Sequence, residues 1–271
     1  MKLKVYAKVN LALYVTAKGV MHSLDGVMAS VGIFDEIEVV ESDRTEVYMD
    51  GVLVGETNSA YKAIRAFERK YHPVSVRVDI TKGIPMEAGL GGSSADSAGV
   101  LYALGKIYSK QVDMLALECG SDVPFMLVGG VARVGGIGES ISTIRLAEYP
   151  SILIVKGEGG VSTPLAYATY DQMNKTISNH TLEAIEDIRR GVYDSEYLFN
   201  DLQAPAISLN ANIEGILSTL VESGLKAVMS GSGSAVWAMG ENLVEVSRAL
   251  EGKYQFVKLT NIVDRGIEEY E

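Results

Sequence analysis

One cysteine stands among the 271 residues, and the sequence has neither a long apolar run nor an excess of positive charge. A single cysteine cannot form a disulfide within the chain, so nothing points to secretion. We expect Cys119 to be a buried structural thiol rather than a nucleophile. No apolar run reaches the roughly 18 residues of a membrane span, and the N-terminal residues lack the apolar core of a signal peptide. We therefore expect a cytoplasmic protein without a membrane partner.

The charge balance is acidic, with a formal net charge of −11 and a pI near 4.9. Nucleic-acid-binding proteins usually carry a basic face, so we expect no nucleic-acid partner. An anionic substrate would need local cations or backbone dipoles to offset the acidic whole. Hydrophobic residues make up 47% of the chain and charged residues 22%, which is ordinary for a globular protein.

Expected strands and helices mix without regular alternation, which predicts an α+β fold rather than a doubly wound sheet. The Asp50-Gly51 pair between two short strands indicates a hairpin. Asn58 is a candidate N-cap for the first helix. A boundary at Tyr149-Pro150 would give domains 1–149 and 150–271. We expect strands at 3–9, 29–31, 35–40, 45–49, 52–54, 74–80, 131–134, 139–144, 152–155, 227–230, 235–239 and 255–259, and helices at 58–69, 94–104, 114–118, 164–170, 182–190, 213–223 and 243–250.

A glycine-rich segment follows the expected strand at 74–80 and precedes a helix. Its glycines permit positive φ and close approach of the backbone to a ligand. Ser93 followed by Asp96 fits a capping box, and a helix start presents free N–H groups to an anion. A tight strand-to-helix turn explains the glycine spacing equally well. The segment reads Pro85-Met86-Glu87-Ala88-Gly89-Leu90-Gly91-Gly92-Ser93-Ser94.

Two common phosphate-binding loops do not match. A Walker A loop needs Gly-Lys-Ser/Thr, whereas Gly105-Lys106 is followed by Ile107. A dinucleotide-binding fingerprint that begins at Gly89 would need Gly or Ala where Ser94 stands.

The glycine-rich segment resembles the central motif of the GHMP kinases, which wraps the phosphates of ATP. Ala7-Lys8-Val9-Asn10-Leu11 resembles the first motif of that family, and Ser230-Gly231-Ser232-Gly233 resembles the C-terminal motif. Gly120-Ser121-Asp122-Val123-Pro124 resembles a segment of one branch whose Asp is the catalytic base. Beyond the central motif, the resemblance assigns Lys8 and Asp122 to catalysis, Asn10 to the substrate, and the segment Gly231-Ser232-Gly233 to a backbone nest near the reacting phosphate.

Each of these residues also has an ordinary structural explanation. Lys8 on an edge strand would extend its ammonium into water. Asp122 precedes a helix start, where a lone Asp is commonly an N-cap. Gly231 and Gly233 alone would indicate a glycine-rich turn.

Further matches narrow the resemblance to a branch that phosphorylates the C2 hydroxyl of a cytidine diphosphate-linked methylerythritol in non-mevalonate isoprenoid synthesis. Asn58 and Lys82 match residues near the nucleotide, and Asn200-Asp201-Leu202-Gln203 matches a family segment with Glu at its last position. In the family, a Tyr-His pair stacks on and reads cytosine. Here the pair is Met21-His22, and Tyr167 is the candidate second stacking ring or, equally, a core ring.

The resemblance implies a two-domain GHMP kinase fold with a ribosomal-protein-S5-domain-2-like ATP domain and a ferredoxin-like C-terminal domain. It implies ATP and Mg²⁺ as cofactors, with the metal ligands unassigned. Another small-molecule kinase of the homoserine or mevalonate type remains an alternative, as does a non-catalytic sensor with this fold. The oligomeric state stays open between a monomer and a weak homodimer.

Overall fold

The computed structural model describes residues 1–19, 21–173 and 178–271. Its strands are β1 (Lys2–Ala17), β2 (Ser23–Glu41), β3 (Glu46–Met49), β4 (Val52–Leu53), β5 (Val76–Thr81), β6 (Val131–Gly136), β7 (Ser140–Thr143), β8 (Ser151–Lys156), β9 (Lys226–Met229), β10 (Val236–Met239), β11 (Phe256–Val263) and β12 (Ile267–Tyr270). Its helices are α1 (Ser59–Lys70), α2 (Gly92–Ile107), the 3₁₀ turn η1 (Asp113–Leu115), α3 (Ala116–Cys119), α4 (Val123–Val128), α5 (Thr163–Gln172), α6 (Thr181–Arg189), α7 (Gln203–Leu209), α8 (Asn212–Glu222) and α9 (Leu243–Leu250). The α+β prediction is confirmed.

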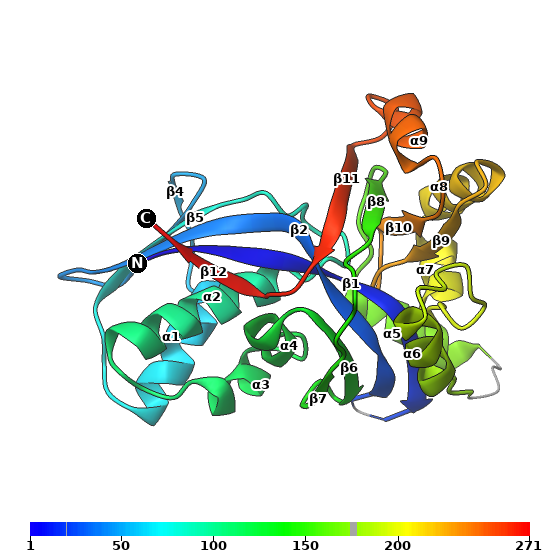
Figure 1. The fold of residues 1–271 in the computed structure, drawn as a ribbon. Helices are drawn as coiled ribbons and strands as arrows, with labels where there is room; N and C mark the ends of the chain where they lie inside the picture. Colours follow the sequence, from blue (N-terminus) through cyan, green and yellow to red (C-terminus); the bar gives the residue numbers. More distant parts are fainter. Residues whose placement is uncertain (20, 174–177) are drawn as a thin grey trace.

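Two long antiparallel strands, β1 and β2, form the spine of the molecule (Figure 1). They pair from Lys2 opposite Glu38 to Ala17 opposite Ser23. The sequence predicted shorter strands because residues 9–15 are buried on both faces and therefore show no alternation. At Gly26 the two backbones approach so closely that a Cβ atom would lie 2.2 Å from the carbonyl oxygen of Ala12.

The remaining strands extend this spine into one mixed sheet. Along its main path the order is β4-β3-β5-β2-β11-β8-β10-β9, while β6 and β12 pair with β2 and β1. The expected hairpin forms, with Met49 opposite Val52 and positive φ at both Asp50 and Gly51. Strand β12 and helix α7 were not predicted.

The end of the chain returns to its beginning. Strand β11 pairs with both β8 and β2, and β12 pairs with β1, so the two termini lie side by side (Figure 1). Residues 256–270 therefore pair with strands on both sides of position 149. The division into domains 1–149 and 150–271 stays a prediction.

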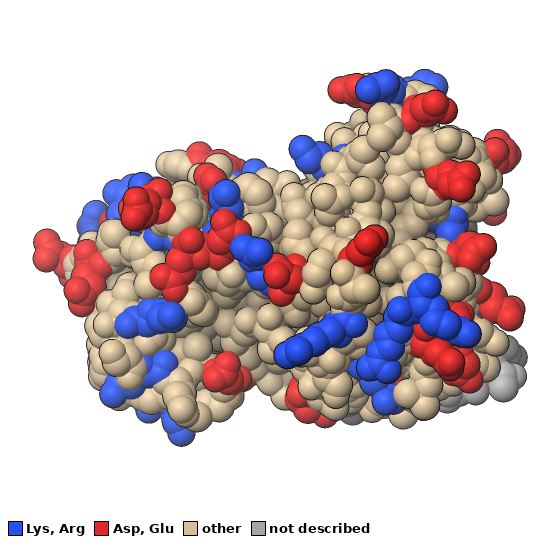
Figure 2. Space-filling view, in the orientation of Figure 1, with Lys and Arg blue, Asp and Glu red and all other residues tan. Residues whose placement is uncertain are grey.

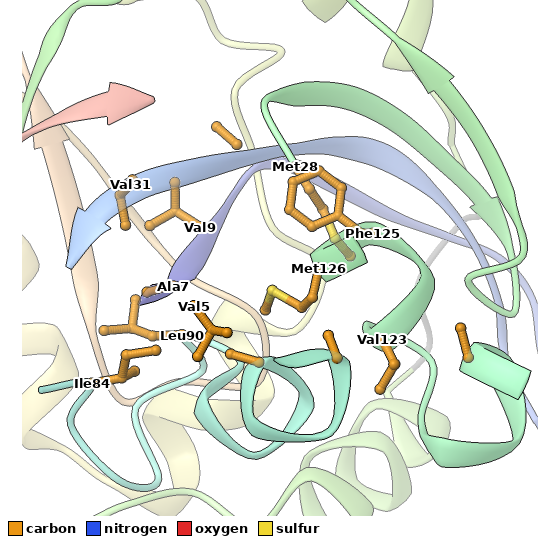
Figure 3. Packing of buried hydrophobic residues seen from close by; sticks show 14 of the residues in the cluster. Val5, Ala7, Val9, Met28, Val31, Ile84, Leu90, Val123, Phe125 and Met126 are labelled. Atoms are coloured by element: carbon orange, nitrogen blue, oxygen red, sulfur yellow. The ribbon is translucent and has the colours of Figure 1, made fainter. Parts of the chain in front are cut away.

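Helices α1 to α4 lie together near the left half of the spine, and α5 to α9 gather at the other end (Figure 1). Helix α2 packs on β1 and β2, and α4 packs on α2. Figure 3 shows Phe125 and Met126 of α4 close to β1 and β2, with Val5, Ala7 and Val9 in the same core. This core fixes β1 and the start of α4, the two elements that carry Lys8 and Asp122.

Successive side chains of a strand point to opposite faces. Ala7 and Val9 belong to the core, so Lys8 between them points away from it. In the described part of the chain, no helix is both long and apolar enough to cross a bilayer.

Candidate active site

A cavity of about 1260 Å³ lies between the glycine-rich segment, β1, the start of α4 and α5. All the candidate residues named from the sequence line it. They come from segments far apart in the chain, which only the fold brings together. These residues are Lys8, Asn10, Met21, His22, Asn58, Lys82, Pro85, Met86, Glu87, Ala88, Gly89, Leu90, Gly91, Gly92, Ser93, Ser94, Asp122, Tyr167, Gly231, Ser232 and Gly233.

Two apolar side chains anchor the glycine-rich segment: Ile84 directly precedes it and Leu90 lies within it. Ile84 and Leu90 are buried in the core (Figure 3), and the backbone N–H of Lys8 donates to the carbonyl of Leu90 at 3.0 Å. Gly91, with φ of 74°, is the N-cap of α2, which begins at Gly92. The backbone that follows Leu90 is thus held at the positive end of a 16-residue helix.

The expected capping box at this helix is wrong. No side chain caps the first turn of α2, and the carboxylate of Asp96 instead accepts a hydrogen bond from Lys82 Nζ at 2.9 Å. A left-handed Gly91 takes the N-cap position, two residues earlier than expected, which leaves the hydroxyl of Ser93 available to a ligand.

Two glycine-rich turns meet backbone to backbone. A Cβ atom on Gly89 would lie 2.1 Å from the carbonyl oxygen of Ser230. The Ser230 hydroxyl donates to the Gly89 carbonyl at 3.0 Å, and Ala235 N–H donates to the Ala88 carbonyl at 3.0 Å. Close approach, rather than a turn alone, therefore explains the glycine at position 89.

Lys8 and Asp122 form the charged centre of the cavity. Lys8 Nζ lies 3.4 Å from Asp122 Oδ2 and donates to Asn10 Oδ1 at 2.6 Å. Lys8 is only 3% exposed, so it is not a surface lysine with its ammonium in water. Asp122 occupies the N-cap position of α4 but makes no capping hydrogen bond with its side chain. Both structural explanations considered for these residues fail, because the two side chains pair with each other.

A second buried charge cluster lies beneath the glycine-rich segment, and the sequence did not predict it. Lys82 Nζ donates to both Asp35 and Asp96, and Asp35 Oδ1 also accepts from the backbone N–H groups of Gly83 and Ile84 at 2.7 and 2.8 Å. Burial raises the pKa of Asp96 to about 7. Burial alone would lower the pKa of Lys82, but the two carboxylates raise it overall.

The far end of the cavity is aromatic. The ring of His22 stacks on Tyr167 with centroids 4.7 Å apart, and His22 Nε2 lies 2.8 Å from Asp171 Oδ1. The His22 side chain is 10% exposed, so it is not a loop histidine in water. Met21 is 56% exposed beside it. Asp171 also lines the cavity and was not predicted.

The Asn200–Gln203 segment supports the second glycine-rich turn. Asn200 Nδ2 donates to the carbonyls of Met229 and Gly231 at 2.7 and 2.8 Å. Gln203 Oε1 accepts from Met229 N–H at 3.0 Å, so the amide supplies the acceptor that a glutamate would also supply.

Two further residues lie where the sequence placed them. Asn58 Oδ1 accepts from Ala60 N–H at 2.9 Å and so caps α1. Cys119 is buried, and burial raises the pKa of its thiol to about 11, which keeps it protonated at neutral pH.

The visible face in Figure 2 carries lysines and arginines interspersed with acidic groups. Within the described residues, no cluster of three or more His, Cys, Asp or Glu side chains could hold a metal ion.

Comparisons with known proteins all indicate the same family. Residues 58–130 match the GHMP kinases N terminal domain and residues 179–254 match the GHMP kinases C terminal domain. A 4-diphosphocytidyl-2-C-methyl-D-erythritol kinase of Thermoanaerobacter pseudethanolicus is 32% identical and covers 100% of this chain and 99% of its own length. The enzyme of that name from Desulfitobacterium hafniense is 33% identical over 96% of this chain and 95% of its own.

Solved structures of other proteins show the same fold. The crystal structure of a 4-(cytidine 5′-diphospho)-2C-methyl-D-erythritol kinase superposes with a TM-score of 0.82 at 29% identity, covering 97% of this chain and 99% of that one. A homoserine kinase from Cytophaga hutchinsonii shares the fold, with a TM-score of 0.71 at 16% identity over 99% and 96% of the two chains. The expected GHMP kinase fold is confirmed, and the chain is a small-molecule kinase that belongs to the 4-diphosphocytidyl-2-C-methyl-D-erythritol kinase family.

Proposed function

We propose that this kinase transfers the γ-phosphoryl group of ATP to the C2 hydroxyl of 4-diphosphocytidyl-2-C-methyl-D-erythritol. The observation that carries the proposal is the Lys8–Asp122 pair, 3.4 Å apart, in a cavity that has phosphate-binding backbone on one side and an aromatic end on the other. A cavity with these two ends suits a substrate that has a reacting alcohol at one end and a nucleobase at the other.

The phosphates of ATP bind along residues 85–94. The free N–H groups at the start of α2 and the hydroxyls of Ser93 and Ser94 supply donors, and the helix dipole favours negative charge there. Asn58, Lys82 and Met86 line the cavity on the nucleotide side.

Asp122 accepts the proton of the C2 hydroxyl as its oxygen attacks the γ-phosphorus. The bond between that phosphorus and the β–γ bridging oxygen breaks, and ADP leaves. The Lys8 ammonium stabilises the Asp122 carboxylate and the charge on the transferring group, while Asn10 holds Lys8 in place. The turn at Gly231–Gly233 adds backbone near the same point.

The protein oxygens fit a Mg²⁺ ion that arrives with ATP. Mg²⁺ keeps several waters and needs only one or two protein ligands besides phosphate oxygens. The hydroxyls of Ser93 and Ser94 at the start of α2 line the cavity and would be such ligands. Bound there, the ion would neutralise charge on the β- and γ-phosphates. A cytoplasmic location stays a prediction.

The test measures ATP consumption with the cytidylated substrate, mevalonate, homoserine and galactose in parallel. We expect turnover with the first alone, and turnover of one of the others instead would contradict the substrate assignment.

Asp122→Asn tests the base. Because the amide cannot take a proton, kcat should fall by at least about a hundredfold, while ATP binding by calorimetry stays within a few-fold of the native value. Retained turnover would refute the role. Glu222→Gln, at an exposed position at the end of α8, serves as the control and should leave kcat unchanged.

A further inference from the structure

At the aromatic end of the cavity, one ring nitrogen of His22, Nε2, is already engaged. The ring stacks on Tyr167 at an interplanar angle of 29° and meets the edge of Tyr170 at 6.4 Å between centroids. A carboxylate only accepts hydrogen bonds, so Nε2 carries the hydrogen that it donates to Asp171 Oδ1. The ring is therefore fixed in plane and in tautomer, and its Nε2 is not available to a ligand.

Asp171, unlike Nε2 of His22, keeps a polar atom that a ligand could contact. It lies one helical turn after Tyr167 on α5, so both side chains are on the same face of the helix. Its side chain is 41% exposed and lines the cavity. Oδ1 takes the bond from His22, whereas Oδ2 accepts no hydrogen bond from any residue within the described ranges. Lys18 Nζ lies 3.9 Å from Oδ1.

We propose that Asp171 is the residue that distinguishes cytosine from uracil, by accepting a hydrogen bond from the 4-amino group of the base at Oδ2. This inference rests on the proposed function, which places a cytidine at this end of the cavity. Cytosine presents an amino donor at C4, and uracil presents a carbonyl acceptor at the same position. An acceptor-only carboxylate binds the first and repels the second.

His22 is then a positioning residue for Asp171. The resemblance to the family assigned the reading to the histidine and a stacking ring to the position of Met21. In this structure Met21 is exposed and His22 lies flat on Tyr167. The histidine holds the Asp171 carboxylate in place, and the carboxylate carries the specificity.

The experiment compares kcat/KM for the cytidine-linked substrate and its uridine-linked analogue. A good base-edge contact contributes roughly ten- to a hundredfold in discrimination, and we expect the native enzyme to prefer cytidine by at least about tenfold. Asp171→Asn should bring the ratio to within about threefold of unity, because an amide can turn either its NH₂ or its oxygen to the base. Glu186→Gln removes an exposed charge on α6 and should leave the ratio unchanged.

Two histidine variants separate the roles. His22→Phe keeps a ring on Tyr167 but cannot donate to Asp171, and we expect it to retain a cytidine preference of at least about fivefold. His22→Ala should weaken both substrates together by about tenfold, a loss that appears in KM rather than in kcat. A histidine that reads the base edge would instead lose the preference in both variants.

Failure of the proposed function and failure of the Asp171 assignment would give different results. If the native enzyme does not phosphorylate the cytidine-linked substrate, the proposed function fails. If it does so, and Asp171→Asn keeps the tenfold preference, the assignment of Asp171 is wrong. A parallel measurement of CDP and UDP binding by calorimetry gives the same ratio without turnover. Thermal melts confirm that each variant is folded.

Discussion

Beneath the glycine-rich segment, one lysine faces two buried carboxylates. Asp35 and Asp96 share the single ammonium of Lys82, and Oδ1 of Asp96 is buried without a hydrogen-bond partner among the described residues. Two carboxylates around one cation leave a net negative charge, which would repel a triphosphate bound directly above. A proton on Asp96 removes that charge, consistent with the raised pKa of this group.

This arrangement predicts a pH dependence of stability. The folded-state pKa of Asp96 is raised from 3.8 to about 7, so the folded protein binds a proton that the unfolded chain has released. Stability therefore falls as pH rises from about 4 to about 7. Asp96→Asn does not titrate, and its free energy of unfolding should vary less across this window. Urea denaturation between about pH 5 and pH 8 measures the difference.

Lys82 does not contribute within that window, because its pKa is raised from an ordinary value of 10.5 and it stays charged. Glu214→Gln, at an exposed position on α8, controls for the loss of a carboxylate. A variant at position 96 with the full pH dependence of the native protein would show that another group is responsible.

At the scale of elements, the proposed phosphate site consists of two turns that touch. The turn before α2 carries Gly89, and the turn between β9 and β10 carries Ser230 and Gly233. Their contact joins an element near the middle of the chain to one near its end, so the shape of the site depends on both.

Gly89→Ala should separate these turns. The new Cβ would lie 2.1 Å from the Ser230 carbonyl oxygen and 2.9 Å from the Gly233 nitrogen, at a φ of +72°. We expect at least about 1 kcal/mol of lost stability from the backbone conformation alone. We also expect kcat/KM for ATP to fall by more than about a hundredfold, because misplacement by about an ångström is costly.

Gly51→Ala is the matched control for this variant. Gly51 has a φ of +78°, but its new Cβ would meet no atom within 4 Å, so the substitution adds the same backbone strain without a collision. It should lower stability and leave kcat/KM for ATP unchanged. Equal losses of activity in both variants would contradict the importance of the close approach.

At the scale of the whole molecule, the last strand supports both catalytic candidates. Strand β12 pairs with β1, which carries Lys8, and Tyr6 N–H donates to the Gly266 carbonyl at 2.8 Å. A Cβ on Gly266 would lie 2.0 Å from the Met126 carbonyl of α4, the helix that follows Asp122. The end of the chain thus packs between the two elements whose spacing sets the Lys8–Asp122 distance.

A chain that ends at Val263 should therefore lose activity as well as stability. Loss of the β12 hydrogen bonds to β1 should cost at least about 2 kcal/mol, and kcat should fall because Lys8 and Asp122 are no longer held together. Guanidinium denaturation and a turnover assay measure the two effects. Removal of Glu271 alone, which lies beyond β12, is the control and should change neither.

The sequence by itself identified the candidate residues of the site, through their resemblance to the motifs of the GHMP kinases. The glycine-rich segment, Lys8, Asp122 and the Gly231 turn were recognisable because each is a local pattern whose function depends on neighbouring residues. The hairpin at Asp50-Gly51 and the cap at Asn58 were predictable for the same reason, since their hydrogen bonds are local.

Only the tertiary structure decided which charges share a site. Asp35 is 47 positions from Lys82, and Asp171 is 149 positions from His22, so no local pattern could pair them. It also showed Asp96 paired with Lys82 instead of capping its own helix. For Asp35 and Asp96 the physical reason is burial: a buried charge takes its partner from whatever the fold packs against it, and that neighbour is rarely adjacent in the sequence.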